Sequence, residues 1–146
     1  MLNKILLFFK KKWIFKKITK SDFLIIEHDN SNFILKYLPV NKTQIISFKI
    51  LNLYIILQIL FSKKKISKLN YFIQAIELIE PNLVVTMIDN DTNFYRLKKY
   101  FPNKKFISFQ NGYRTEPIKT YNIKKREKLS CDIIFCFGKQ NINYYK

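Results

Sequence analysis

The stretch LVVTMIDND, residues 83–91, decides the fold together with KFISFQNG, residues 105–112. Both begin as continuous apolar runs rather than as alternating patterns, which is typical of strands covered on both faces in a parallel sheet. Between them, residues 92–100 predict a helix that is capped by Asp91 or Thr92. A strand, a helix and a second strand in this order predict a parallel pair with a right-handed crossover.

The rest of the chain continues this alternation of strands and helices. We expect further strands at residues 23–27, 43–48 and 132–137, and further helices at residues 32–38, 50–61 and 66–80, with a loop at 113–130 and another helix after Gly138. Because residues 50–61 are apolar on nearly every side, they should form a central buried helix. The order of elements predicts an α/β fold with a doubly wound, mainly parallel Rossmann-like sheet and helices on both faces.

The N-terminal segment, residues 1–20, is apolar and basic and allows two interpretations. It forms either an amphipathic helix on a membrane surface or, as we favour, a first strand followed by a surface connection. No segment reaches the roughly 20 apolar residues of a bilayer-spanning helix. Residues 21–146 are assigned to one Rossmann-like domain. Because the chain stops directly after a strand and a helix start, we expect this domain to be truncated before a second one.

The chain is strongly basic, with 27 Lys and Arg against 10 Asp and Glu and a net charge of +17. Such a charge attracts polyanions. The Lys residues are scattered, however, and the sequence is equally rich in Ile, Asn, Phe and Tyr, so we favour compositional drift as the origin of the charge. An anionic membrane surface is the main alternative. We expect no nucleic-acid partner, because no nucleic-acid-binding module is visible.

Cysteine, histidine and glycine usage restricts the chemistry. Cys131 and Cys136 are the only thiols, and with the single His28 they do not make a zinc site, so we expect no metal. Buried, reduced thiols fit a cytoplasmic protein. With only 2 Gly, the glycine-rich phosphate loops of dinucleotide and ATP sites are excluded, and we expect no cofactor in this domain.

Three polar clusters follow predicted strand ends. Ligands of open α/β sheets bind at the carboxyl ends of the strands, where loops converge and helix N-termini point their free N–H groups. We therefore expect the clusters at one edge of the sheet: EHDN at residues 27–30, DNDTN at residues 89–93 and QNGYR at residues 110–114.

Each cluster also has a purely structural interpretation. Residues 89–93 can be a helix cap and turn, and residues 110–112 a plain turn. Arg114 favours function for the latter, because its donor fork suits a phosphate or carboxylate. For Glu27 and His28 we favour a solvated loop, and the functional alternative is a general base.

The run from Pro81 to Arg114, PNLVVTMIDNDTNFYRLKKYFPNKKFISFQNGYR, resembles the bacterial surface carbohydrate biosynthesis protein family, as does CDIIFCFGK at residues 131–139. These are glycosyltransferase-like proteins of O-antigen and capsule polysaccharide loci, with the two-domain glycosyltransferase-B architecture. The resemblance rests on an Asp-Asn pair after a strand, a Phe-Tyr pair in the next helix, and Gln-Asn-Gly followed by a basic residue.

The resemblance implies that the chain is the N-terminal, acceptor-side half of a glycosyltransferase and inactive alone. The full-length protein would use a nucleotide-sugar donor and a glycan or lipid-linked acceptor, in the cytoplasm or peripherally on the inner membrane. The alternative is a non-catalytic α/β domain that binds an anionic ligand or membrane surface. As a hypothesis, Asp89 or Glu27 accepts the acceptor proton. The substrate-binding candidates are Asn90, Asn93, Gln110, Asn111, Gly112, Arg114 and His28.

Overall fold

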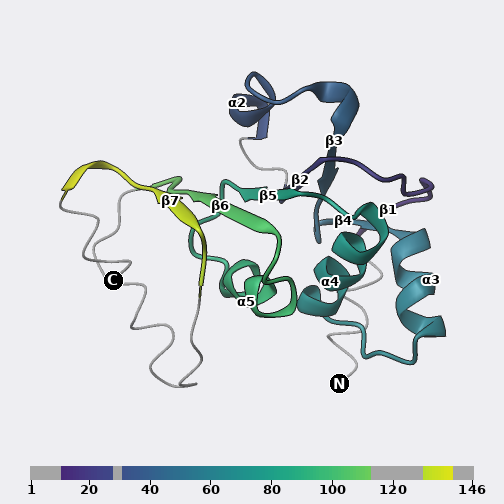
Figure 1. The fold of residues 1–146 in the computed structure, drawn as a ribbon. Coiled ribbons are helices and arrows are strands. Elements are labelled where there is room, and N and C mark those ends of the chain that lie inside the picture. Colours follow the sequence, from purple (N-terminus) through teal and green to yellow (C-terminus); the bar gives the residue numbers. More distant parts are fainter. Residues whose placement is uncertain (1–10, 28–30, 113–129, 140–146) are drawn as a thin grey trace.

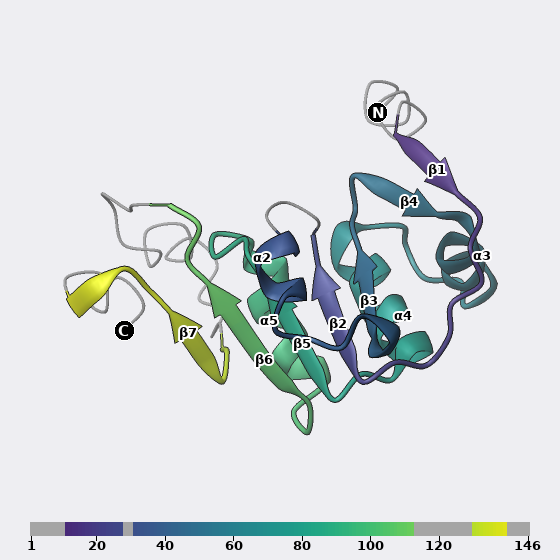
Figure 2. The same cartoon turned by 90° about the horizontal axis from the view of Figure 1, so that it is seen from above.

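The computed structural model describes residues 11–27, 31–112 and 130–139, and this part of the chain contains a five-stranded parallel sheet. The strands lie in the order β3-β2-β5-β6-β7 (Figure 2) and comprise β2 (Phe23–Ile26), β3 (Thr43–Ile46), β5 (Leu83–Thr86), β6 (Lys105–Phe109) and β7 (Ile133–Phe135). Near their carboxyl ends, Ile26, Thr86 and Ser108 are aligned across three neighbouring strands. The predicted α/β fold with a mainly parallel sheet is confirmed.

Helices cover both faces of the sheet (Figure 1). The elements are α2 (Ser31–Leu35), the 3-10 turn η1 (Val40–Lys42), α3 (Leu53–Phe61), α4 (Lys68–Ile79) and α5 (Thr92–Tyr100). Below the sheet in Figure 1 lie α4 and α5, with α3 beside α4, whereas α2 lies above it. The larger core is on the α4 and α5 side, where Phe72, Phe94 and Phe106 are fully buried. A smaller core around Ile25 and Val85 lies on the α2 side.

A second, two-stranded parallel sheet corrects the prediction for residues 50–61. In it β1 (Lys12–Ile14) pairs with β4 (Ile50–Asn52), so α3 begins only at Leu53. The reason lies in Asn52, whose side chain caps α3 by accepting the N–H of Tyr54 at 2.9 Å. The backbone N–H of Asn52 in turn donates to the hydroxyl of Tyr71 at 2.8 Å. A polar residue within an apolar run therefore separates a strand from a helix.

The same small sheet bears on the N-terminal segment. Residues 11–20 are its described part, and they contain β1 followed by an irregular connection, which agrees with the strand interpretation. Residues 1–10 lie outside the described residues. Among the described residues, no helix is long and apolar enough to cross a membrane.

The expectation that the helix of residues 50–61 is buried on all sides is wrong. Ile55, Ile56 and Ile59 of α3 pack into the larger core, but Leu57 and Leu60 on its other side are exposed. No other described element covers this outer side, because α3 lies at the margin of the molecule, beyond α4 (Figure 1). Apolar composition thus predicted burial that the position of the helix does not provide.

Other predicted elements are shorter than expected. The strand expected at 43–48 ends at Ile46, the helix expected at 32–38 ends at Leu35, and the strand expected at 132–137 covers Ile133–Phe135 at the sheet edge. The predicted loop at 113–130 lies almost wholly outside the described residues, as does most of the helix expected after Gly138.

The thiols are less buried than expected. Cys131 and Cys136 are free and half-buried rather than enclosed. Cys131 donates to the carbonyl of Phe106 at 3.1 Å, and burial raises the pKa of its thiol from 9.0 to about 11. A thiol with so high a pKa is a poor nucleophile at neutral pH, which favours a packing role.

Replacing Tyr71 by Phe is expected to lower stability at pH 7 and to reduce alkaline sensitivity. The substitution leaves the buried N–H of Asn52 without its acceptor, at a cost of about 1–2 kcal/mol. Burial raises the pKa of Tyr71 from 10.0 to about 12, so the folded chain retains a proton that the unfolded chain loses. Wild-type stability should therefore fall as the pH rises from 10 towards 12, and the variant lacks this contribution. Urea unfolding of both proteins at pH 7 and pH 11 tests this prediction. If the free energies of unfolding of wild type and Tyr71→Phe differ by the same amount at both pH values, the prediction is wrong.

Candidate functional site

The carboxyl ends of β2, β5 and β6 lie side by side, so the polar residues that follow these strands share one edge of the sheet (Figure 2). The clusters after β5 and β6 are in direct contact. The backbone N–H of Asn111 donates to the carboxylate of Asp89 at 3.4 Å, across 22 positions of sequence. Two motifs that the sequence separates by a helix are thus joined in the fold.

Asp89 lies beneath this edge rather than on its surface. Its side chain is fully buried, and its carbonyl oxygen accepts a hydrogen bond of 2.7 Å from the hydroxyl of Tyr95 on α5. The same hydroxyl lies 3.2 Å from the hydroxyl of Ser108 on β6. Tyr95 therefore connects the turn after β5 to the neighbouring strand, and the carboxylate of Asp89 orders the turn after β6.

Gln110 holds the backbone at the same edge through buried hydrogen bonds. It is buried, its side-chain amide donates to the carbonyl of Gly112 at 2.7 Å, and its side-chain oxygen accepts the N–H of Phe137 at 2.9 Å. The backbone N–H of Gln110 also donates to the carbonyl of Phe135. These bonds connect β6 to β7 and hold the turn that carries Asn111. Gln110 therefore has a structural role at this edge.

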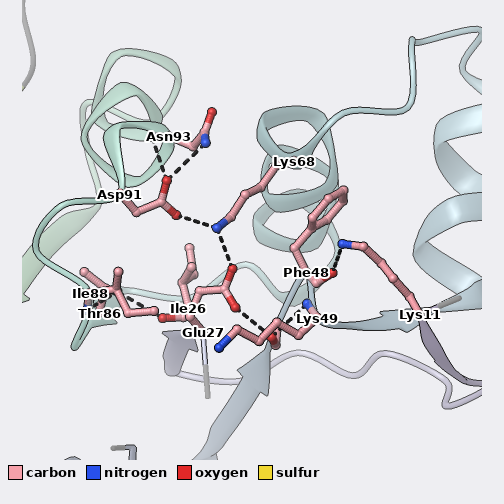
Figure 3. A network of polar contacts seen from close by, with 11 residues as sticks. Lys11, Ile26, Glu27, Phe48, Lys49, Lys68, Thr86, Ile88, Asp91 and Asn93 are labelled. Carbon is pink, nitrogen blue, oxygen red and sulfur yellow. Dashed lines mark hydrogen bonds and ion pairs between the residues drawn. The ribbon is translucent and has the colours of Figure 1, made fainter. Parts of the chain in front are cut away.

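A second group of polar residues lies at the ends of β2 and β3, next to the start of α4 (Figure 3). Glu27 is only 2% exposed, so the solvated loop expected at this residue is wrong, because Ser47 and Lys68 enclose its carboxylate. One of its carboxylate oxygens accepts a hydrogen bond of 2.7 Å from the hydroxyl of Ser47, and the other lies 2.7 Å from the ammonium of Lys68. The backbone of Glu27 has a φ of 67°, a left-handed conformation that is costly for a residue with a side chain. The network thus holds Glu27 in a strained conformation.

Lys68 connects Glu27 to the start of α5. Its ammonium lies 3.0 Å from Asp91, whose other oxygen caps α5 by accepting the N–H of Asn93 at 3.1 Å. Burial lowers the pKa of Lys68, but the hydrogen bonds and charges of Glu27 and Asp91 raise it by more than burial lowers it. The net result is a pKa above the ordinary value of 10.5. Lys68 is therefore charged at neutral pH and bridges Glu27, which follows β2, and Asp91, which follows β5.

Lys68 was missed by sequence reasoning. It is the first residue of α4, where a positive charge opposes the helix dipole. That mismatch is the signal that a carboxylate partner should be sought, although the sequence does not show which one.

A second lysine adds positive charge beside this network. The ammonium of Lys11 lies 3.6 Å from the ring centre of Phe48 and donates to its carbonyl (Figure 3). Burial lowers the pKa of Lys11, the charge of Glu27 raises it, and the charge of Lys68 lowers it, with a net lowering. On this side of the edge, the ammonium groups of Lys68 and Lys11 therefore lie near the carboxylates of Glu27 and Asp91.

The solvent-facing rim of the edge consists of amides. Asn90 and Asn111 are exposed, and Gly112 is half-buried. The side chain of Asn93 donates to Asp91 at 3.1 Å. Two of the sequence-predicted residues, His28 and Arg114, lie outside the described residues.

The structure thus divides the predicted site into two groups. Asp89, Gln110 and Asn111 belong to the edge of β5 and β6, whereas Glu27 and Asp91 belong to the Lys68 network. No cluster of three or more His, Cys, Asp or Glu side chains that could hold a metal ion occurs in the described part of the chain. The geometry supplies buried carboxylates that position backbone, and exposed amides that can bind a ligand.

No protein-family model, curated protein or solved structure matches this chain. The α/β fold therefore rests on the structure itself, and the family resemblance of residues 81–114 stays a prediction.

Proposed function

We propose that this chain is the acceptor-side domain of a glycosyltransferase-like protein in bacterial surface polysaccharide biosynthesis. The observation that carries the proposal is the contact between Asn111 and Asp89 at 3.4 Å. It joins the two motifs on which the family resemblance rests, and it does so at the carboxyl edge where α/β sheets bind their ligands.

The chemistry of the rim suits a sugar or phosphate group. The side-chain amides of Asn90 and Asn111 each offer donors and an acceptor, the combination that sugar hydroxyls require. In the proposed complex these amides contact the acceptor, and Arg114 adds a donor fork for its phosphate. The nucleotide-sugar donor is held by a second domain, and the protein works in the cytoplasm or at the inner membrane surface.

The proposed acid–base role belongs to Glu27 or Asp89. Both carboxylates are buried and occupied: Glu27 by Ser47 and Lys68, and Asp89 by the N–H of Asn111. Activating an acceptor hydroxyl requires one of them to exchange a protein partner for the substrate. This requirement favours a second candidate function, in which the edge binds an anionic ligand without catalysis.

Ligand titration by two-dimensional NMR tests the proposal on the chain alone. We expect farnesyl diphosphate-linked N-acetylglucosamine to shift the amide signals of Asn90, Asn111 and Gly112, and UDP-glucose to shift them far less. Asn111→Ala should weaken acceptor binding roughly tenfold, the effect of removing one or two ligand hydrogen bonds. Asn82→Ala is the matched control, because Asn82 is an exposed Asn that precedes β5 at the opposite edge of the sheet.

Inorganic diphosphate separates the two candidates. If it binds at the same amides as tightly as the sugar-linked compound, the edge recognises an anion and the binding-domain candidate holds. Absence of shifts with all three compounds would reject the edge as a ligand site.

A further inference from the structure

The outer side of α3 is an uninterrupted apolar stripe. Leu53, Leu57, Leu60 and Phe61 are 38%, 37%, 52% and 79% exposed. Their spacing of i, i+4, i+7 and i+8 places them on one side of the helix, opposite the buried Ile residues of the same helix. A surface helix of a globular protein ordinarily carries polar residues on this side, so an all-apolar stripe indicates a surface that meets something apolar.

Basic residues flank both ends of this stripe. Lys63 and Lys65 follow α3 directly; both are exposed and make no ion pair within the described part of the chain. At the other end, the side-chain amide of Asn52 donates to the carbonyl of Lys16 at 2.8 Å, which fixes the Phe15-Lys16-Lys17 segment next to the start of α3. Figures 1 and 2 both show the chain after β1 running beside α3.

Phe15, next to Lys16, adds a further exposed apolar side chain near the start of α3. It is 72% exposed, and its neighbours Lys16 and Lys17 are exposed as well. Apolar side chains with lysines around them match a bilayer surface, where the apolar groups enter the acyl boundary and the lysines meet lipid phosphates.

Acidic residues are absent from this part of the sequence. The chain contains no Asp or Glu before Asp22 and none between Asp29 and Glu77. Among the described residues, only Lys64 of the basic run after α3 is paired, with Glu77 at 3.4 Å. The stripe therefore lies in a positive field, which repels a second copy of this chain and attracts an anionic surface.

We propose that α3, together with Phe15, Lys16, Lys17, Lys63 and Lys65, is a docking surface for an anionic lipid bilayer. The helix lies parallel to the membrane plane. Phe15 and Phe61, at opposite ends of the surface, enter the acyl boundary, and the four lysines contact anionic headgroups. The proposal is independent of the carboxyl-edge ligand site, because it uses none of the residues of that edge.

Vesicle co-sedimentation tests the docking surface with the intact chain. We expect binding to vesicles of 70% phosphatidylcholine and 30% phosphatidylglycerol, and little binding to phosphatidylcholine alone. Leu57→Gln/Phe61→Ser should weaken binding roughly tenfold, and Lys63→Gln/Lys65→Gln by a similar factor at low salt. All four side chains are exposed, so unchanged circular dichroism and melting are expected for these variants.

The matched control carries the same type of change on the other side of the sheet. Phe33 on α2 and Tyr37 after it are 51% and 73% exposed, and Phe33→Ser/Tyr37→Ser should bind as the wild type does. Equal weakening by the control, or unchanged binding by both α3 variants, overturns the proposal. The proposal is also overturned if the wild type binds no vesicles but forms a dimer in light scattering, and if Phe61→Ser abolishes that dimer. In that case α3 is a contact between two copies of the chain.

The fluorescence of a single tryptophan measures how deeply α3 enters the bilayer. Trp13 is the only Trp of the chain, so Trp13→Phe/Phe61→Trp places the sole indole on the stripe. Brominated lipids should quench its fluorescence, and should leave Trp13→Phe/Phe33→Trp unquenched. The reverse pattern would place another surface against the bilayer.

Discussion

Replacing Lys68 by Met is expected to lower the free energy of unfolding by about 3 kcal/mol at neutral pH. The change leaves Glu27, 2% exposed, and Asp91, 8% exposed at its side chain, without the cation that both contact within 3.0 Å. Removing one partner of a buried ion pair costs about 3–5 kcal/mol, and the 32% exposure of the Lys68 side chain places the effect at the lower end. Glu27 should then leave its left-handed conformation.

Lys64→Met is the matched control for this prediction. Lys64 pairs with Glu77 at 3.4 Å on the surface, with both side chains at least 40% exposed, so its loss should change stability by less than about 1 kcal/mol. Urea unfolding of both variants gives the comparison. Equal effects of the two substitutions would show that the Lys68 network is no stronger than a surface ion pair.

The pH dependence of the Lys68 effect has a defined sign. The partners raise the folded-state pKa of Lys68 above its ordinary value of 10.5, so its contribution is complete below pH 10.5 and is lost as the pH rises through the folded-state pKa. The difference between wild type and Lys68→Met should therefore be constant from pH 7 to pH 9 and should shrink above pH 10.5.

Phe94→Ala is expected to destabilise the chain by about 3–5 kcal/mol, the usual cost of truncating a fully buried Phe. The ring of Phe94 on α5 meets Phe106 of β6 edge to face, with 5.6 Å between ring centres. The cavity left by the variant should also loosen α5, and with it the hydroxyl contacts of Tyr95 to Asp89 and Ser108. The amide of Asn111 should then exchange its hydrogen faster than in the wild type.

Tyr100→Ala on the same helix is the control for Phe94. Its side chain is 53% exposed, so truncation should change the free energy of unfolding by less than about 0.5 kcal/mol. Thermal unfolding compares the two variants, and hydrogen exchange at Asn111 follows the candidate site. If Phe94→Ala loses much stability but hydrogen exchange at Asn111 is unchanged, the packing of α5 does not hold the candidate site in place.

The two predictions share a physical basis. Lys68 and Phe94 each join the first turn of a helix to a neighbouring part of the sheet, Lys68 through charge and Phe94 through packing. The exposed amides of Asn90 and Asn111 are positioned by such buried contacts, so stability and ligand binding at this edge should change together.

The local sequence pattern did not predict the lengths of several elements, or which of their sides are buried. Residues 50–61 read as one apolar helix, yet Asn52 ends a strand and caps α3, because Tyr71 of α4 accepts its N–H. Apolar residues on all sides of α3 likewise predicted burial, but only the side that faces α4 is covered by described residues. Both features depend on where α4 lies, and no local window of sequence contains that information.

Local sequence by itself determined the parallel α/β framework. Continuous apolar runs such as residues 83–86 predict doubly covered strands, and Asp91 caps the helix that follows, as its position indicates. These features depend on neighbours within a few positions, where side-chain type and hydrogen-bonding capacity act directly. The shared carboxyl edge follows from the alternation of strands and helices.

Only the tertiary structure decided how the polar residues at that edge divide. It buried Asp89 beneath Asn111, and it brought Glu27 and Asp91 to the ammonium of Lys68 from separate elements. Charge partners act through space and depend on the packing of β2, α4 and α5, whereas sequence spacing records only distance along the chain. For this reason the sequence located the edge, and the fold separated its buried carboxylates from its exposed amides.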